Sequence, residues 1–170
     1  MVTATTHPAP CDGRGDGNGL RVAVVRSRFN DAVTARLLEG ALEALRASGV
    51  ADGDVSVLEV PGAVELAFAA RLAAEKLGVD AVVCLGAVIR GETDHYDHVC
   101  RLAADTIARA AEETGVLVAF GVLTCEKLEQ ALARSGKGGE NRGGHAALAA
   151  LEMALLKRRL SGRAAQGAGS

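Results

Sequence analysis

The densest group of chemically reactive side chains lies in residues 89–98, which read IRGETDHYDH. This stretch holds two histidines, two aspartates, one glutamate and one arginine, and it follows the apolar run AVVCLGAV (81–88). Such side chains carry protons near neutral pH or bind metal ions. A metal site, an acid/base site and the capped start of a helix are three interpretations of the same residues.

The metal interpretation would use Asp94, His95, Asp97 and His98. The His-x-x-His spacing lacks a third, remote ligand of an obvious type, and aspartates are also typical of a helix N-terminus. The cysteines do not supply the missing ligand, because no two of them are spaced as CxxC. Cys84 and Cys100 fall on apolar positions, which is typical of small buried side chains. We therefore expect neither a metal ion nor another cofactor.

The same stretch could bind an anion. Gly91 allows a close approach of backbone to ligand, and Thr93 or Asp94 can cap the following helix, whose free N–H groups and dipole attract negative charge. A plain capping role would explain Thr93 and Asp94 without any ligand. The chain contains no GxGxxG or GxxxxGK[ST] motif, which argues against a dinucleotide site or a P-loop.

Two further features suggest a ligand site. Arg134, Lys137 and Arg142 surround a glycine-rich break near the C-terminus, and they form either a phosphate clamp or a solvated basic surface. Phe29 is one of very few aromatic residues and follows an apolar run in a polar loop. It is either a lid that packs over a helix or a platform on which a planar ligand stacks.

Apolar runs and helical periodicities alternate along the chain. Strands are predicted at 21–25, 55–60, 81–89 and 116–124, and helices at 32–49, 64–78, 95–115, 126–135 and 141–160, with glycines at several helix ends. This alternation predicts a parallel α/β sheet with helices on both faces. Such sheets bind ligands at the carboxyl ends of their strands. The loops at 27–30, 61–65 and 90–95 and the strand end near Phe120 should therefore meet there.

The length of 170 residues suits one domain, predicted at 20–160. We expect residues 1–19, rich in Gly, Pro and Thr, to be a flexible arm, and 161–170 to be a frayed tail. A net charge of −2 argues against a nucleic-acid partner. No apolar run reaches the length of a membrane span, and the N-terminus lacks an apolar signal segment, so a cytoplasmic protein is expected.

Several motifs occur together in a fixed order: RFN (28–30), VPGAVEL (60–66), LGAVIRGETDHYDHV (85–99), FGVLT (120–124), EQALARSG (129–136) and NRGGHAALAALEMA (141–154). In this combination the chain resembles the lumazine synthase family over roughly residues 20–158. The resemblance implies a flavodoxin-like three-layer sandwich, with a four-stranded parallel sheet between helices.

The resemblance also implies a reaction. The family condenses 5-amino-6-(D-ribitylamino)uracil with 3,4-dihydroxy-2-butanone 4-phosphate to 6,7-dimethyl-8-ribityllumazine, phosphate and water, the penultimate step of riboflavin biosynthesis. This transferase reaction moves protons at each step, which suits an imidazole.

Family roles carry over to matching positions of this sequence. By resemblance, His95 is the catalytic proton carrier. The uracil and its ribityl chain would contact Phe29, Asn30, Ala63, Glu65, Val88, Ile89 and Phe120. The phosphate would bind Glu92, Thr93 and Arg134, with Arg142 as an accessory residue, and Phe120 and Arg134 would come from a neighbouring subunit.

Four positions depart from the family pattern. Val64 stands where an aromatic residue is usual, Ala67 where proline is usual, and Arg142 where lysine is common. Asp94 adds a negative charge beside the phosphate loop. Two other functions remain open at this point: a flavin-binding or regulatory module without turnover, and a metal hydrolase built on Asp94, His95 and His98.

The resemblance finally implies self-association. Family members form homo-oligomeric pentamers, and some join twelve pentamers into a hollow icosahedral capsid of 60 subunits. In shell formers the segment between the last two helices is short and glycine-rich, as SGKGGEN (135–141) is here. The arm before Leu20 could add a strand to a neighbour. We therefore expect the shell rather than the free pentamer.

Overall fold

One parallel sheet organises the molecule, for which the computed structural model describes residues 17–167. Its four strands lie in the order β2-β1-β3-β4, and all neighbouring pairs are parallel. The strands are β1 (Val22–Ser27), β2 (Val55–Val60), β3 (Ala81–Ile89) and β4 (Leu117–Cys125). The predicted strands are confirmed within about two residues of their ends.

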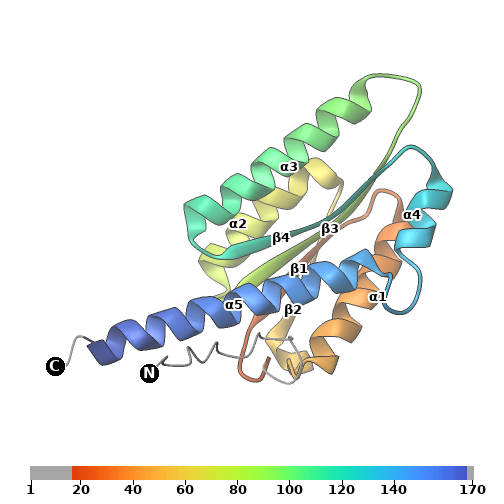
Figure 1. Ribbon diagram of the computed structural model, residues 1–170. Helices are drawn as coiled ribbons and strands as arrows, with labels where there is room; N and C mark the ends of the chain where they lie inside the picture. Colours follow the sequence, from red (N-terminus) through yellow and green to blue (C-terminus); the bar gives the residue numbers. More distant parts are fainter. Residues whose placement is uncertain (1–16, 168–170) are drawn as a thin grey trace, which may run out of the picture.

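Helices cover both faces of this sheet, as Figure 1 shows. One face is covered by α2 and α3 and the other by α1 and α5, while α4 follows the end of β4. The helices are α1 (Asp31–Ala47), α2 (Leu66–Lys76), α3 (His95–Thr114), α4 (Leu128–Arg134) and α5 (Arg142–Gly167), with short 3₁₀ turns η1 (Asp52–Asp54) and η2 (Ala63–Glu65). The predicted α/β sandwich with a four-stranded parallel sheet is confirmed.

The sheet separates two apolar cores. Leu37, Leu45 and Leu151 belong to the core between the sheet and the α1–α5 layer. Leu66 and Ile107 belong to the core under α2 and α3. Residues 81–87 of β3 are buried without interruption because this strand contributes to both cores. That double burial explains why its sequence is continuously apolar instead of alternating.

Helix ends follow the predicted glycines. Gly49, Gly78 and Gly115 all have positive φ, the conformation that ends a helix at lowest cost when the residue has no Cβ. The helix boundaries lie within about two residues of the predicted ones, except at the end of the last helix. The helix after Pro61 begins with the 3₁₀ turn η2 and becomes α-helical only at Leu66. The last helix continues to Gly167, because one glycine among Arg, Ala and Gln lowers helix propensity without stopping the helix.

The chain ends are only partly described. Residues 1–16 of the expected arm and 168–170 of the expected tail lie outside the described residues. Gly17 is buried, and its N–H donates to the Ser48 carbonyl over 2.8 Å. The last residues of the expected arm are therefore attached to the end of α1.

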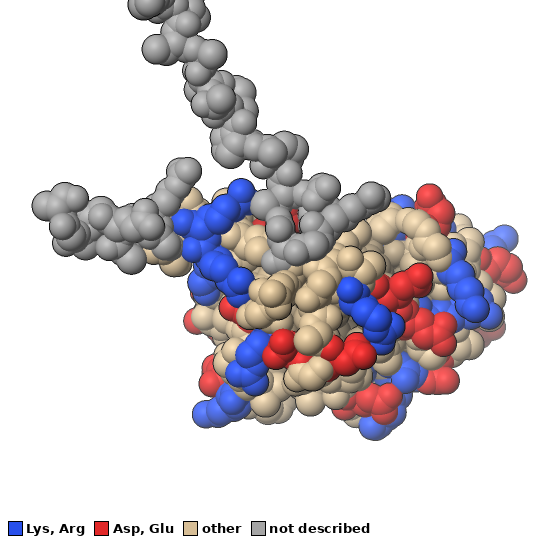
Figure 2. Space-filling model, turned by 90° about the horizontal axis from the view of Figure 1, so that it is seen from below, with Lys and Arg blue, Asp and Glu red and all other residues tan. Residues whose placement is uncertain are grey.

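Charges of both signs are interspersed on the face seen in Figure 2, which views the molecule from below Figure 1. No helix within residues 17–167 combines the length and the apolar character needed to cross a membrane.

Candidate active site

A pocket of about 380 Å³ lies where the loops after β1, β2 and β3 meet at the carboxyl ends of these strands. This is the position at which parallel α/β sheets bind ligands. Its walls are partly apolar and carry one carboxylate, one imidazole and one phenol. The lining residues are Phe29, Gly62, Ala63, Val64, Glu65, Ala87, Val88, Ile89, Gly91, Thr93, His95, Tyr96 and Val99.

Phe29 projects into this region from the loop after β1, and its exposed fraction is 69%. The backbone N–H of Arg28 donates to the Val60 carbonyl over 2.8 Å, and that of Phe29 donates to the Pro61 carbonyl over 3.1 Å. These bonds fix the loop against the end of β2. A large, exposed ring on a fixed backbone suits a stacking platform better than a packing lid.

Asn30 supports Phe29 from the next position. It is the one described non-glycine residue with positive φ (58°), a conformation that asparagine adopts more readily than most residues. The turn leads β1 directly into α1. The side-chain amide of Asn30 donates to the Ala87 carbonyl over 2.8 Å and thereby ties the loop to β3. Asn30 does not line the pocket itself.

An ion-pair network centred on a buried arginine links the elements next to this loop. Arg26, whose exposed fraction is 8%, pairs with Asp31 at the start of α1 and with Glu59 of β2 over 2.8 Å. Its Nε lies 3.3 Å from the hydroxyl of Thr34. A buried guanidinium must be paired to offset its desolvation, so this network fixes β1, β2 and α1 relative to one another.

The loop after β3 forms the far wall of the pocket. The Thr93 hydroxyl accepts the N–H of His95 over 3.4 Å, whereas Asp94, at the N-cap position of α3, makes no side-chain cap. Thr93 is therefore the better-placed of the two expected caps. The pocket wall includes Gly91 and Thr93 but not Glu92, whose side chain is exposed.

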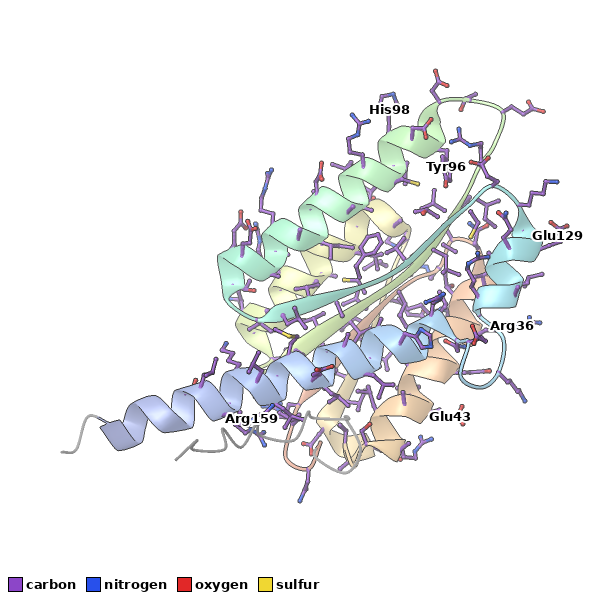
Figure 3. All side chains as sticks on the ribbon, in the orientation of Figure 1. Arg36, Glu43, Tyr96, His98, Glu129 and Arg159 are labelled. Atoms are coloured by element: carbon purple, nitrogen blue, oxygen red, sulfur yellow. The ribbon has the colours of Figure 1, made fainter. Side chains whose placement is uncertain are left out.

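The two histidines of the stretch 89–98 lie in different surroundings. His95 lines the pocket and His98 does not. Figure 3 shows His98 on the outer side of α3, pointing away from the sheet, while Tyr96 points inward toward the strand ends. Within residues 17–167, no three His, Cys, Asp or Glu side chains gather as a metal-ligand set. Asp94, His95 and His98 thus do not form the set that a metal hydrolase would need.

Tyr96 is a pocket residue that sequence reasoning did not select. Burial raises the pKa of its phenol above the ordinary value, and neighbouring Cys100 raises it further. Burial also raises the pKa of Cys100 and of Cys125, so these thiols stay protonated at neutral pH. The signal for Tyr96 was present, since it is the single tyrosine of the chain and follows His95 directly.

The remaining predicted residues lie around a second, separate pocket of about 440 Å³ on β4, α4 and α5. Phe120 is exposed there by 45%, beside Arg134 and Arg142. A single chain therefore does not bring these three residues to the pocket of Phe29. Lys137, grouped with the two arginines by sequence, does not line either of these two pockets.

His145 also lines the second pocket and was not selected from the sequence. Its Nε2 lies 2.5 Å from the Gly139 carbonyl and its Nδ1 lies 3.2 Å from Nη1 of Arg142. A carbonyl only accepts and a guanidinium only donates, so the proton belongs on Nε2. Arg134 and Arg142 make this pocket suited to an anionic ligand.

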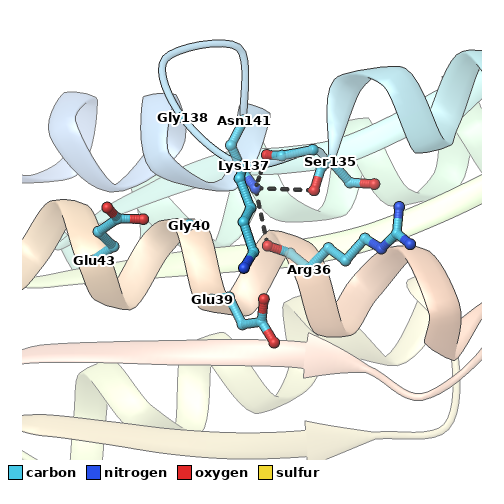
Figure 4. Close-up of a pocket in the computed structure, with 9 residues that line it drawn as sticks. Arg36, Glu39, Gly40, Glu43, Ser135, Lys137, Gly138 and Asn141 are labelled. Atoms are coloured by element: carbon cyan, nitrogen blue, oxygen red, sulfur yellow. Dashed lines mark hydrogen bonds between the residues drawn. The ribbon is translucent and has the colours of Figure 1, made fainter.

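A third hollow, of about 630 Å³, lies between α1 and the turn that joins α4 to α5. It contains Lys137 and none of the residues predicted for the site. The labelled side chains in Figure 4 are mainly charged, and Asn141 closes the turn by hydrogen bonds to backbone carbonyls. Its side chains of opposite charge, from Arg36, Lys137, Glu39 and Glu43, select no particular ligand.

The fold is a flavodoxin-like α/β sandwich, and its first pocket lies at the carboxyl ends of the parallel strands. Residues 19–158 match the sequence model of the 6,7-dimethyl-8-ribityllumazine synthase family, and the chain belongs to this family. It is accordingly a transferase of riboflavin biosynthesis that acts in lumazine synthesis.

Proposed function

We propose that the protein condenses 5-amino-6-(D-ribitylamino)uracil with 3,4-dihydroxy-2-butanone 4-phosphate to form 6,7-dimethyl-8-ribityllumazine. The observation that carries this proposal is one pocket lined by an exposed aromatic ring, Phe29, a carboxylate, Glu65, and an imidazole, His95. In the proposal Phe29 stacks on the uracil ring, and Glu65 accepts hydrogen bonds from the ribityl hydroxyls. Ala63, Val88 and Ile89 line the ring pocket through their backbone groups.

The proton transfers are assigned to His95. The uracil amine adds to the ketone and loses water to give an imine. Phosphate then leaves by elimination, and the second amine closes the ring with loss of a further water. Each step needs a group that both accepts and donates a proton near neutral pH, which imidazole does. Holding both substrates in one pocket supplies the remaining rate acceleration through proximity.

The phosphate is assigned to the start of α3 and to cations of a second copy. Backbone N–H groups of Glu92 and Thr93 precede a helix of 20 residues, whose dipole favours an anion. In the proposal, Arg134, with Arg142 as an accessory and Phe120 as a lid, reaches this phosphate from the neighbouring subunit. Within one chain these three side chains line a separate pocket and do not reach the loop after β3, which supports their contribution from a neighbouring copy.

A site shared by two copies requires an oligomer, and we propose the family's pentameric ring, further assembled as a shell of twelve pentamers. The turn at 135–141 supports the shell because it is short and contains Gly138 with positive φ (86°). Light scattering or electron microscopy of the purified protein tests this proposal. Particles of pentamer mass alone, at neutral pH and modest salt, would refute the shell.

The reaction is tested by incubating the purified protein with both substrates and following the fluorescence of the lumazine product. Product formation that depends on both substrates and on enzyme concentration would establish the activity. A protein that binds a yellow flavin but forms no lumazine would contradict the proposal.

A further inference from the structure

Arg90, the first residue after β3, uses three nitrogens of its guanidinium at once. Nη1 and Nη2 lie 3.3 Å and 3.0 Å from the two carboxylate oxygens of Asp97, and Nε lies 2.8 Å from the Glu126 carboxylate. The guanidinium carbon lies 4.2 Å from the centre of the Tyr96 ring, within cation–π distance. The planar guanidinium thus pairs with a carboxylate on each of two edges and packs one face on an aromatic ring.

The sheet register brings these groups together. Ile89 of β3 pairs with Cys125 of β4, so the next residues on each strand, Arg90 and Glu126, leave the sheet side by side. The N–H of Arg90 also donates to the Cys125 carbonyl over 2.9 Å. Glu126 is itself held, because its N–H donates to the Gln130 side chain in the first turn of α4 over 2.9 Å.

These contacts close the loop that contains Gly91, Glu92 and Thr93. Arg90 lies at its start, and Asp97 lies in the first turn of the helix at its end. The bidentate bond therefore joins the two ends of an exposed loop. Within the loop, the described residues add one weak side-chain bond, from His95 N–H to the Thr93 hydroxyl over 3.4 Å.

We infer that Arg90 is a positioning residue: by clamping Asp97, Glu126 and Tyr96 it holds the loop at 91–94 in the shape that binds the phosphorylated substrate. The inference rests on the proposed function, since it assigns that loop to the phosphate. Tyr96 lines the pocket, and in this inference the guanidinium packed on the face of its ring also sets its orientation.

A direct role of Arg90 as a phosphate ligand is the competing explanation, and the geometry argues against it. Two carboxylates already occupy the guanidinium, and their combined charge exceeds that of the arginine. The two explanations differ in what the carboxylates do. If Arg90 positions the loop, removal of a carboxylate loosens the loop and weakens substrate binding. If Arg90 binds phosphate, removal of a carboxylate frees the cation and strengthens binding.

The clamp should matter little for overall stability. The side chains of Arg90, Asp97 and Glu126 are 35%, 55% and 58% exposed, and exposed ion pairs contribute little to folding. Variants at these positions should therefore fold, with unfolding midpoints close to that of the wild type. Arg46→Ala is a matched control, because Arg46 forms an exposed ion pair with Asp52 at the other end of α1.

The test compares Arg90→Lys, Asp97→Asn, Glu126→Gln and Arg46→Ala in steady-state kinetics. Lysine keeps the charge but cannot form the bidentate and Nε contacts together. We expect Arg90→Lys and Asp97→Asn to raise KM for the butanone phosphate roughly tenfold, since small displacements of a binding group are costly. Glu126→Gln should act in the same direction, while KM for the uracil and all constants of Arg46→Ala should change less than about twofold.

Amide hydrogen exchange supplies a measurement that does not depend on turnover. The amide hydrogens of residues 91–95 should exchange faster in Arg90→Lys and Asp97→Asn than in the wild type. Those of the sheet should exchange at the wild-type rate. A lower KM for the butanone phosphate in Asp97→Asn would overturn the inference in favour of a direct ligand. Loop exchange in Arg90→Lys equal to that in Arg46→Ala would also overturn it. Wild-type protein that forms no lumazine would refute the proposed function, and the exchange data would still decide whether Arg90 clamps the loop.

Discussion

Asn141 donates through its side-chain amide to the backbone carbonyl of Arg36 over 2.9 Å, which attaches the α4–α5 turn to the middle of α1. The same nitrogen lies 3.1 Å and 2.9 Å from the carbonyls of Ser135 and Gly136. Its oxygen accepts the N–H groups of Gly143 and Gly144, in the manner of an N-cap of α5. One buried side chain thus orders the turn, the start of α5 and the contact with α1.

Asn141→Ala should destabilise the protein by about 3 kcal/mol, because it removes a helix cap and leaves buried carbonyls without a donor. The free energy of unfolding, measured by urea denaturation, checks this expectation. Lys137→Ala is the control, since this exposed residue of the same turn should change stability by less than about 0.5 kcal/mol. Equal effects of the two substitutions would show that the Asn141 contacts do not stabilise the turn.

Gly143→Ala should be destabilising for a steric reason. A Cβ at this position would lie 2.0 Å from the Leu37 carbonyl, where α5 crosses α1. Backbone cannot move aside as a flexible side chain can, so we expect a loss of about 2–3 kcal/mol. Gly139→Ala is the control, because nothing lies within 4 Å of its added Cβ. Thermal or urea unfolding distinguishes the two, and a near-neutral Gly143→Ala would contradict the close crossing.

The sequence predicted the strands and the loops of the site because these depend on local patterns. Nine consecutive residues of β3 are apolar or small, and this run alone indicates a central strand with a ligand loop at its end. His95 and Phe29 could be selected as site residues because each follows such a strand. Family resemblance then supplied specific roles, which periodicity could not.

Other features of the site depend on contacts between distant parts of the chain. Arg90 was visible in the reactive cluster, but its bond to Glu126 follows from the register of β3 with β4. Side-chain direction was also undetermined: His95 and His98 share a helix start, and only the folded helix separates them between pocket and outer face. Tertiary packing decides such cases, and a single sequence does not report it.

Cys84 should make stability depend on pH in the alkaline range. Burial raises the pKa of its thiol to about 12, whereas an unfolded thiol ionises near pH 8.5. The folded chain therefore keeps a proton that the unfolded chain loses. The stability contributed by this group is complete below about pH 8.5 and is lost progressively as the pH rises toward 12.

The comparison with Cys84→Ala isolates this effect. The stability difference between wild type and variant should shrink by roughly 1.5 kcal/mol between pH 8.5 and pH 10, because the variant lacks the titrating group. Urea unfolding at each pH provides the measurement. Val83→Ala removes an apolar side chain from the same strand and no titratable group. The stability difference between wild type and this variant should therefore not change with pH. A constant difference for Cys84→Ala as well would mean that the thiol is not buried as described.

His95→Ala should slow lumazine formation by about 10²-fold or less, since part of the reaction proceeds by proximity alone. His98→Ala should have a much smaller effect, because His98 lies on the outer side of α3. Steady-state rates of the two variants with saturating substrates give the comparison. Equal losses would show that His95 is not the residue that transfers protons.

The last prediction concerns the shared site. Arg134→Ala should raise KM for the butanone phosphate or abolish activity, since a charge-assisted bidentate contact is lost, while the uracil substrate binds as before. Arg134 lines a different pocket from His95 within one chain.

If each site combines His95 of one copy with Arg134 of the next, subunits that carry one substitution should complement subunits that carry the other. Co-refolded His95→Ala and Arg134→Ala chains would then regain roughly a quarter of wild-type activity, the fraction of interfaces in a randomly mixed ring with both residues intact. Chains carrying both substitutions, mixed with themselves, give the baseline. Absence of recovery in mixed rings of confirmed composition would mean that Arg134 does not act across a subunit boundary.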